Sequence, residues 1–222
     1  MSYESTITFT LDTICPWTYL GYLRLKKALS EYSSPKVTFT LRFAPYQLYP
    51  DFSKDGEDKH AWYKREKYNN DEQKMKLYTQ YMGELGKQEG VEFDFHGVIA
   101  NTLDAHRVLF STQESKGPEA AQKAVESLYA QYFTEQAHPS AKDTLTKACT
   151  AAGLSEDEAK SLVEDESEGL MDVKMAIREQ TGNGVDSVPY VVFEGRRRDF
   201  TLVGAKEVKE YVKTMEQVGK EA

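Results

Sequence analysis

A single cysteine stands where a predicted strand gives way to a predicted helix. Cys15-Pro16-Trp17-Thr18 follows an apolar alternating run that ends at Leu11, and it precedes a helical pattern over residues 19–29. At a helix start, the unpaired backbone N–H groups and the helix dipole stabilise a thiolate. Pro16 suits the first helical turn because its missing N–H is not needed there. The sequence therefore predicts that Cys15 is a nucleophile near neutral pH.

Thr18 occupies the fourth position of this motif, so the motif holds one thiol and cannot close an internal disulfide. A hydroxyl one turn from the sulfur can stabilise a thiolate, but an ordinary helical threonine explains the residue equally well. Asp12 would raise the thiol pKa or move a proton, although a polar residue that ends a strand is the simpler interpretation. Cys149 lies on an apolar helix face, and we interpret it as a core residue rather than a resolving thiol.

A proline far along the chain completes the candidate site. Ser187-Val188-Pro189 directly precedes a dense run of β-forming residues over 190–193. A thiol motif together with such an X-Pro segment is typical of a thiol site that faces a proline loop. The candidate site therefore has Cys15 and Thr18 as its chemical groups, and its border comprises Pro16, Trp17, Val188 and Pro189.

The hydrophobic pattern predicts the elements that must position these residues. Alternation with period two marks strands over residues 5–11 and 37–43, with a helix of about 15 residues between them. A strand–helix–strand unit of this length makes the two strands parallel neighbours. After these elements come a largely helical stretch over 59–165, a helix from about residue 170, a hairpin with strands at 190–193 and 196–202, and a last helix after Gly204.

The predicted fold class is α/β, in two halves with a helical block between them. Residues 1–45 and 168–222 are expected to form one small α/β domain, and residues 46–167 an inserted α-helical domain. A chain of 222 residues is long enough to bury a sizeable core.

Charge and cysteine content narrow the possible settings. The formal net charge is −8, which argues against binding to nucleic acid or to an anionic membrane, because both need a positive field. Two cysteines are too few for a secreted disulfide scaffold, and the N-terminus shows no signal-peptide pattern. We therefore expect no membrane span and a reducing, cytoplasmic setting, where a reactive thiol meets mostly glutathione.

Three segments, in their order and spacing, resemble the DsbA-like branch of the thioredoxin superfamily. They are Asp12-Thr13-Ile14-Cys15-Pro16-Trp17 with Tyr19-Leu20-Gly21, then Asn101-Thr102-Leu103-Asp104-Ala105-His106-Arg107, then residues 185–192. Within that branch the chain is most similar to FrnE-type proteins, whose relatives include kappa-class glutathione transferases and 2-hydroxychromene-2-carboxylate isomerases. The resemblance implies a thioredoxin fold with a large helical insertion. It makes Pro189 a cis-proline beside Cys15, and it implies that the backbone of Val188 pairs with a bound peptide or glutathione.

The chain departs from the family pattern in ways that affect the expected chemistry. FrnE-type oxidoreductases usually carry Cys-Pro-Trp-Cys, whereas this chain ends the motif with Thr18. Kappa-class and chromene isomerase relatives generally carry serine where Cys15 stands. In the kappa class, a helix start comparable to Gly204-Ala205-Lys206 holds the γ-glutamyl end of glutathione through backbone N–H groups and an acidic side chain; this chain has Lys206 instead.

Three further side chains are candidates for the binding site. Lys64 is a candidate glutathione contact. Asn101 and His106 could line the cleft between the two halves of the chain, although His106 also fits a buried core histidine, because it shares an apolar helix face. The histidines show no metal-ligand spacing, so we expect no metal.

The sequence favours a monothiol, glutathione-dependent enzyme that acts on a small apolar or electrophilic substrate. Either Cys15 attacks a disulfide or an electrophile and glutathione resolves the product, or glutathione is the nucleophile and the Cys15 region stabilises its thiolate. Oxidoreduction, transfer and isomerisation all stay open. The alternatives are a protein-thiol disulfide oxidoreductase of the DsbA family and a non-catalytic module that binds peptides or thiols. The kappa class also suggests a homodimer.

The variant Thr18→Val tests whether the hydroxyl acts on the sulfur. Valine keeps the volume and removes the donor, so we expect the pKa of Cys15 to rise. Thiolate absorbance measured against pH gives this pKa. An unchanged titration curve would remove Thr18 from the mechanism.

Overall fold

A four-stranded sheet forms the centre of the molecule in the computed structural model, which describes residues 2–222. β1 pairs parallel with β2 and antiparallel with β5, and β5 pairs antiparallel with β6. The predicted βαβ unit and the predicted hairpin are therefore confirmed, and the α/β fold class is correct. The strand order across the sheet is β2 (Val37–Pro45), β1 (Tyr3–Leu11), β5 (Tyr190–Phe193) and β6 (Phe200–Val203).

β1 is the strand that carries the candidate site, and it is held from both edges. Its side chains Ile7, Phe9 and Leu11 have no exposed surface. Burying a side chain of this size contributes about 2 kcal/mol, so the strand is firmly fixed. Because β1 ends at Leu11, the chain delivers residues 12–15 to the end of the sheet.

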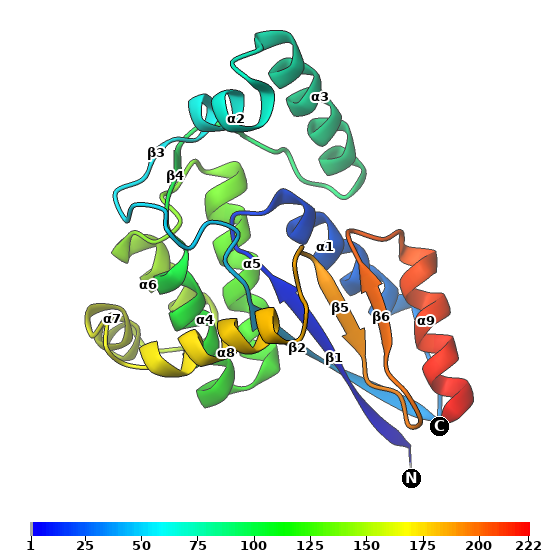
Figure 1. Cartoon of the computed structure of the whole chain (residues 1–222). Helices are drawn as coiled ribbons and strands as arrows, with labels where there is room; N and C mark the ends of the chain where they lie inside the picture. The colour runs from blue at the N-terminus through cyan, green and yellow to red at the C-terminus, as the bar shows by residue number, and fades with distance from the viewer. Residues whose placement is uncertain (1) are drawn as a thin grey trace.

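Helices cover the sheet in two groups (Figure 1). α1 (Pro16–Glu31) packs beside α9 (Val208–Glu221) on one side of the sheet. The helices that contact β2 on the other side are α4 (Leu103–Lys116), α5 (Pro118–Thr134) and α8 (Leu170–Gly182). One continuous hydrophobic core contains side chains from β1 as well as from α5, so the sheet and the helical insertion share their interior.

Two parts make up the rest of the insertion. α6 (Lys142–Ala151) and α7 (Glu156–Glu164) extend the helical layer beyond α5. α2 (Lys59–Tyr68) and α3 (Glu72–Gln88) form a helical hairpin at the top of Figure 1. A short antiparallel pair, β3 (Glu57–Asp58) with β4 (Val98–Ile99), closes the base of this α2–α3 hairpin.

Buried charged side chains anchor the α2–α3 hairpin to the rest of the molecule. At its start, the Lys59 ammonium donates to the carbonyl oxygens of Tyr132 at 2.9 Å and Asp94 at 3.1 Å. Near its end, Arg24 of α1 pairs with Glu89 at 2.7 Å and also with Glu207 at 2.8 Å. These contacts fix the hairpin over the start of α1, because breaking a buried charged pair is costly.

Arg107 explains part of the 101–107 motif in structural terms. Its guanidinium is fully buried and donates to the carbonyl oxygens of Leu162 at 2.7 Å, Asp165 at 3.1 Å and Glu168 at 3.1 Å. These carbonyls belong to the end of α7 and the following turn, where helix carbonyls lack intrahelical partners. Arg107 therefore joins α4 to the connection between α7 and α8.

The structure corrects two boundaries near the C-terminal half. The strand expected over 196–202 begins at Phe200, because residues 194–199 form the hairpin loop and expose Arg196, Arg197 and Arg198. The last helix begins at Val208, four residues after Gly204. Within residues 2–222, no helix is both long and apolar enough to cross a membrane.

Gly21 marks the closest approach of α1 to the proline loop. A Cβ added there would lie 3.0 Å from Cγ of Pro189 and 3.5 Å from Cα of Ala205. Such distances leave room for a glycine and little more. The spacing between α1 and the loops on either side of the hairpin therefore depends on the absence of a side chain at position 21.

Two glycine replacements in helices should change stability in opposite directions. Gly21→Val overpacks the contact with Pro189 and should lower the free energy of unfolding by about 1–3 kcal/mol. Gly83→Ala in α3 is the matched control, because a Cβ there meets nothing within 4 Å. It should stabilise the protein by about 0.5–1 kcal/mol through helix propensity. Urea unfolding measures both free energies. A Gly21→Val variant with an unchanged free energy of unfolding would contradict the close approach of α1 to Pro189.

Candidate active site

Cys15 is the N-cap residue of α1 and lies just beyond the end of β1. The Cys15 N–H donates to the carbonyl oxygen of Asp12 at 3.1 Å, and the Cys15 carbonyl accepts from Thr18 N–H at 3.0 Å. Pro16 occupies the first helical position, as the sequence predicts. The sulfur therefore lies at the positive end of the helix.

The predicted proline loop lies against the thiol. Sγ of Cys15 is 3.8 Å from the carbonyl oxygen of Val188 and can donate its proton to that oxygen. The Val188–Pro189 peptide bond is cis. Cys15, Val185 and Val188 form a small hydrophobic cluster, against which Trp17 packs. Two segments that are 173 residues apart in the sequence thus meet at the sulfur.

Burial reverses the expected acidity of Cys15. The residue is only 6% exposed, and the loss of solvent raises the pKa of its thiol to about 12. Backbone N–H groups of Thr18 and Trp17 lower this pKa, and the charge of Asp12 raises it further. Burial thus opposes the thiolate near neutral pH that the helix start favours, and the reactivity of Cys15 stays a prediction. A helix terminus contributes about 1 kcal/mol, which is less than the cost of burying a charge.

Thr18 is buried beneath the thiol and points at backbone carbonyls. Its hydroxyl lies 2.7 Å from the carbonyl oxygen of Cys15 and 2.8 Å from that of Asp12. A hydroxyl has one hydrogen to donate, so these acceptors compete with the sulfur for it. The role of Thr18 as a thiolate partner stays a prediction.

Asp12 and His106 form a fully buried pair next to the thiol segment. Nε2 of His106 lies 3.2 Å from one carboxylate oxygen of Asp12, and the N–H of Leu48 donates to the other oxygen at 2.8 Å. The second ring nitrogen of His106, Nδ1, has no partner among the described residues. His106 therefore lies behind the site and orients Asp12.

Asn101 holds the loop that follows β2. Its side-chain oxygen accepts hydrogen bonds from Gln47 at 3.1 Å and from the N–H of Leu103 at 2.8 Å. Its side-chain nitrogen donates to the carbonyl oxygens of Pro50 at 2.8 Å and Phe52 at 3.1 Å. An asparagine side chain has two donors and two acceptor positions, so the loop uses its full capacity.

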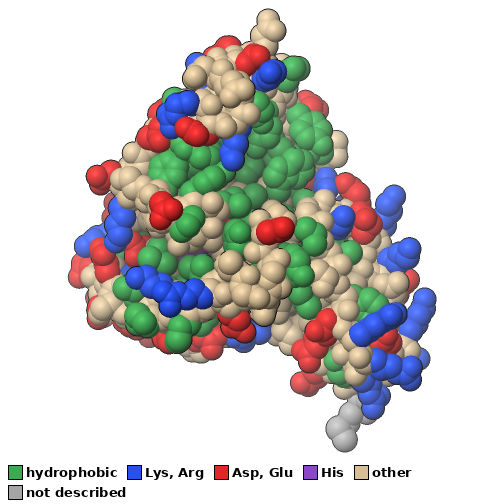
Figure 2. Space-filling view, in the orientation of Figure 1, with side chains coloured by type: hydrophobic (Ala, Val, Ile, Leu, Met, Phe, Trp, Pro, Cys, Tyr) green, Lys and Arg blue, Asp and Glu red, His purple; other side chains and the backbone are tan. Residues whose placement is uncertain are grey.

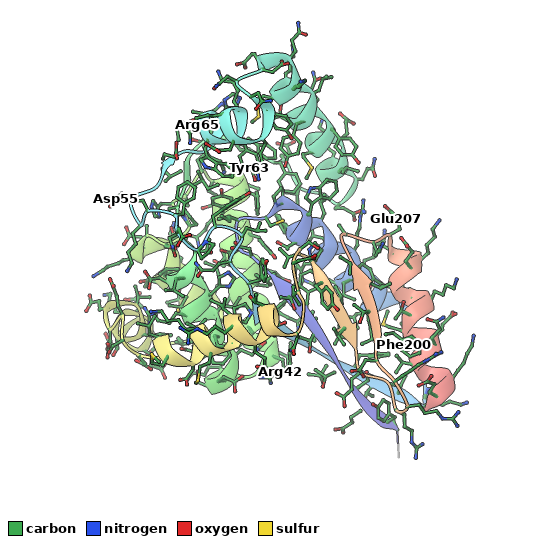
Figure 3. The ribbon with its side chains drawn as sticks, viewed as in Figure 1. Arg42, Asp55, Tyr63, Arg65, Phe200 and Glu207 are labelled. Carbon is green, nitrogen blue, oxygen red and sulfur yellow. The ribbon has the colours of Figure 1, made fainter. Side chains whose placement is uncertain are left out.

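The segment Gly204-Ala205-Lys206 is a loop beside the cis-proline. The N–H of Gly204 donates to the carbonyl oxygen of Pro189 at 2.8 Å. The expected helix start at this segment is wrong, because α9 begins at Val208, where the carboxylate of Glu210 accepts from the N–H of Glu207 at 3.0 Å. Glu207 stands at this end of α9 in Figure 3. The segment still borders the site, but its N–H groups are not the first turn of a helix.

An apolar cavity of about 360 Å³ opens beside the sulfur. Figure 2 shows hydrophobic side chains gathered on this face, between the α2–α3 hairpin and the rest of the molecule. Tyr63, labelled in Figure 3, lies under α2 on the side that faces the body of the protein. The residues lining the cavity are Ile14, Cys15, Pro16, Trp17, Leu48, Tyr49, Tyr63, Lys67, Tyr68, Tyr78, Asp186, Ser187 and Val188.

The basic residue that lines this cavity is not the one selected from the sequence. Lys64 pairs with Glu72 at 3.1 Å and is absent from the lining, whereas Lys67, one helical turn later, belongs to it. Sequence reasoning also missed the tyrosines of the cavity wall. The many tyrosines in the insertion were a signal for an apolar cleft, but that signal fits an ordinary core equally well.

Cys149 lies in the core, away from this site. It is 1% exposed on α6, and burial raises the pKa of its thiol to about 11. Both cysteines are free. Among residues 2–222 there is also no group of three or more histidine, cysteine, aspartate or glutamate side chains that could hold a metal ion.

The sheet, the thiol at the start of the first helix and the cis-proline facing it define a thioredoxin fold. The chain belongs to the family of the DSBA-like thioredoxin domain, which matches residues 6–216. No curated protein matches the sequence significantly.

Solved structures share this fold at low sequence identity. A probable DsbA oxidoreductase from Streptomyces coelicolor has a TM-score of 0.86 at 20% identity, over 98% of this chain and 91% of that one. A 2-hydroxychromene-2-carboxylate isomerase has a TM-score of 0.70 at 15% identity, over 96% and 95%. The cytosolic disulfide reductase DsbM from Pseudomonas aeruginosa, solved with GSH, has a TM-score of 0.60 at 14% identity, over 97% and 96%.

Neutralising Asp12 should make the thiol more acidic. In Asp12→Asn the amide oxygen can still accept from Leu48, while the charge that raises the Cys15 pKa is lost. Alkylation by iodoacetamide, followed against pH, should then be faster at every pH below the pKa, by about tenfold for each unit of pKa.

Glu66→Gln, which removes an exposed carboxylate on α2, is the control and should leave the profile unchanged. A melting temperature for each variant confirms folding. An alkylation profile for Asp12→Asn that matches the parent, or is slower, would show that Asp12 does not act on the sulfur.

Proposed function

We propose that this protein is a glutathione-dependent enzyme in which Cys15 keeps its proton and holds glutathione as the reacting thiolate. The position of the Cys15 thiol is the observation that supports this: it is buried, its pKa is raised to about 12, and it faces the Val188 carbonyl. A free cysteine thiol has a pKa of about 8.5. When the thiol of glutathione lies beside that of Cys15, the thiol with the higher pKa keeps the proton. The proton then resides on Cys15, and the negative charge resides on the glutathione sulfur.

The surroundings of the thiol suit a peptide-like co-substrate. The backbone that leads into the cis-proline at Pro189 offers an edge with which glutathione, itself a short peptide, can pair. Pro16 and Trp17 supply an apolar border on the other side. The 204–206 loop lies next to Pro189 and is the candidate contact for the γ-glutamyl end.

The bound thiolate then reacts with an electrophilic carbon of a small substrate in the cavity. In transfer, a carbon–sulfur bond forms and a leaving group departs with its bonding electrons. In isomerisation, glutathione adds to a conjugated double bond and is expelled again after rotation, so it is regenerated. In both reactions Cys15 donates a hydrogen bond to sulfur and stays covalently unchanged.

Relatives with this fold are consistent with such chemistry. The DsbM structure was solved with GSH, and another protein with this fold is a 2-hydroxychromene-2-carboxylate isomerase. Serine at the Cys15 position in kappa-class proteins would also donate a hydrogen bond while staying protonated. We place the enzyme in the cytoplasm, where glutathione is abundant; DsbM is likewise a cytosolic disulfide reductase.

A second candidate function is thiol exchange with partner proteins. Tyr81 and Leu77 on α3 are 55% and 65% exposed, and the Tyr81 ring lies 6.2 Å from that of Trp17. Apolar surface thus continues outward from the cavity, as a docked protein segment would require. In this reaction a Cys15 thiolate attacks a disulfide, releases one thiolate, and is freed from the mixed disulfide by glutathione.

Two replacements of Cys15 distinguish these functions. Cys15→Ser keeps a protonated donor, so it should retain conjugation of glutathione to chlorodinitrobenzene. Cys15→Ala removes the donor and should lower the rate at least about tenfold. Both variants should be inactive in glutathione-dependent reduction of hydroxyethyl disulfide, if the parent reduces it.

The opposite results would contradict the role of Cys15 as a hydrogen-bond donor. Reduction by the parent protein, together with loss of both activities in Cys15→Ser, would support exchange chemistry and overturn the donor role. No glutathione-dependent turnover in the parent with either substrate would leave the non-catalytic binding module as the better account. Cys149→Ser is the matched control, because that thiol is buried away from the cavity.

A further inference from the structure

α8 leaves most of its surface uncovered, and it runs across the front of the molecule in Figure 1. All 13 of its residues belong to the described chain, and Val173 alone among them is buried. Met171 and Met175 are 65% and 55% exposed. They lie about one turn apart, so their side chains are neighbours on the helix surface. Methionine is apolar and flexible, and it is over-represented at surfaces that bind other proteins.

An open groove of about 590 Å³ lies beside these methionines, between α4 and α8. Met175 and Ala176 line it from α8, and Phe110 lines it from α4. Phe110 and Ala176 are half-buried, so each still presents apolar surface to a ligand. This α4–α8 groove and the cavity beside Cys15 share no lining residue, and the two are separate sites.

Acidic side chains border the apolar surface of the α4–α8 groove. Glu168, Asp172 and Glu179 line the groove, and none of the three has an ion-pair partner among the described residues. Asp172 and Glu179 lie about two turns apart on the same side of α8. Glu114 of α4 lines the groove as well, but Arg42 pairs with this carboxylate. Three negative charges therefore face solvent beside exposed apolar side chains.

The basic residues of α8 do not neutralise these charges within the groove. Lys174 and Arg178 lie about 200° and about 240° around the helix axis from Asp172, at 100° for each residue. Neither of them lines the groove. The groove thus combines an apolar surface with a negative field, and it favours a ligand that is both apolar and positively charged.

We propose that the α4–α8 groove binds a basic amphipathic segment of another protein. The apolar side chains of that segment pack on Met171, Met175 and Phe110, and its lysines or arginines pair with the three carboxylates. The apolar contacts supply affinity that salt does not screen, and the charges select a basic partner over an acidic one. This interaction is independent of the proposed function, because it uses none of the residues around Cys15.

Three peptides of equal length test the groove. The probe is an amphipathic peptide of lysine and leucine, and the comparisons are oligolysine of equal charge and a peptide of glutamate and leucine. The lysine–leucine peptide should bind at least about tenfold more tightly than oligolysine, because only it has apolar side chains. The glutamate–leucine peptide should not bind. Fluorescence anisotropy of labelled peptides gives the affinities.

Methionine methyl signals in a ¹³C NMR spectrum show where the peptide binds. The signals of Met171 and Met175 should shift with the lysine–leucine peptide. The signals of Met75, Met82 and Met215, which have no exposed surface, should stay in place. The buried methionines are thus an internal control for unfolding or a general change of the protein.

Removal of the two kinds of contact should have separate effects. Met175→Ser should weaken binding of the lysine–leucine peptide about tenfold, whereas Leu77→Ser, which removes an equally exposed apolar residue from α3, should not. The double variant Asp172→Asn with Glu179→Gln should also weaken binding about tenfold and make it less dependent on salt.

Glu156→Gln with Glu216→Gln is the matched charge control, because both residues are exposed and lie outside the groove. Absence of binding, equal affinity for oligolysine, an equal loss in the two charge variants, or unshifted signals of Met171 and Met175 would overturn the proposal. Self-association that disappears in Arg196→Glu with Arg197→Glu would also overturn it. That result would assign the groove to the exposed arginine loop of a second copy of this chain.

Discussion

The structure depends on one constraint: a thiol is taken out of water at the place where a helix dipole would stabilise its charge. Cys15 lies at the positive end of α1, yet Val188, Trp17 and the cavity wall exclude solvent from it. Desolvation outweighs the helix terminus, and the pKa rises to about 12. In the function proposed above, this sulfur keeps its proton and donates a hydrogen bond as a hydroxyl would, instead of attacking as the thiolate of a dithiol oxidase does.

The surrounding residues maintain this arrangement from several directions. Gly21 lets α1 approach Pro189 closely, and the N–H of Gly204 fixes the carbonyl of Pro189. Asp12 holds the chain after β1 through Leu48 and is itself held by His106. Each of these contacts joins segments that are distant in sequence, so the geometry at the sulfur is a property of the whole fold.

The helical insertion supplies the part of the site that differs from a bare thioredoxin fold. The α2–α3 hairpin is anchored at both ends, by Lys59 and by the pairing of Arg24 with Glu89. It thereby places tyrosines and Lys67 over the thiol. Because the sheet and the insertion share a continuous core, the cavity between them has a fixed shape rather than that of a loose interdomain gap.

The sequence by itself determined the elements and the partners at the centre of the site. Period-two alternation gave β1 and β2, proline and cysteine marked the start of α1, and the distant Val188–Pro189 pair was correctly matched to Cys15. These features arise from neighbouring residues or from a motif with a defined geometry. The order of residue types along the chain is therefore enough to predict them.

Only the tertiary structure decided the acidity of the thiol and the composition of the cavity. The pKa of Cys15 depends on how much solvent reaches it, and solvent access is set by residues from five separate segments. Lys64 and Lys67 look equivalent in the sequence, but the packing of α2 turns one toward Glu72 and the other toward the cavity. Likewise, nothing in the sequence around Asn101 indicates that its side chain is fully hydrogen-bonded by the loop after β2. The burial and orientation of a side chain depend on residues that are distant in the sequence. For that reason the pattern of residue types along the chain does not reveal them.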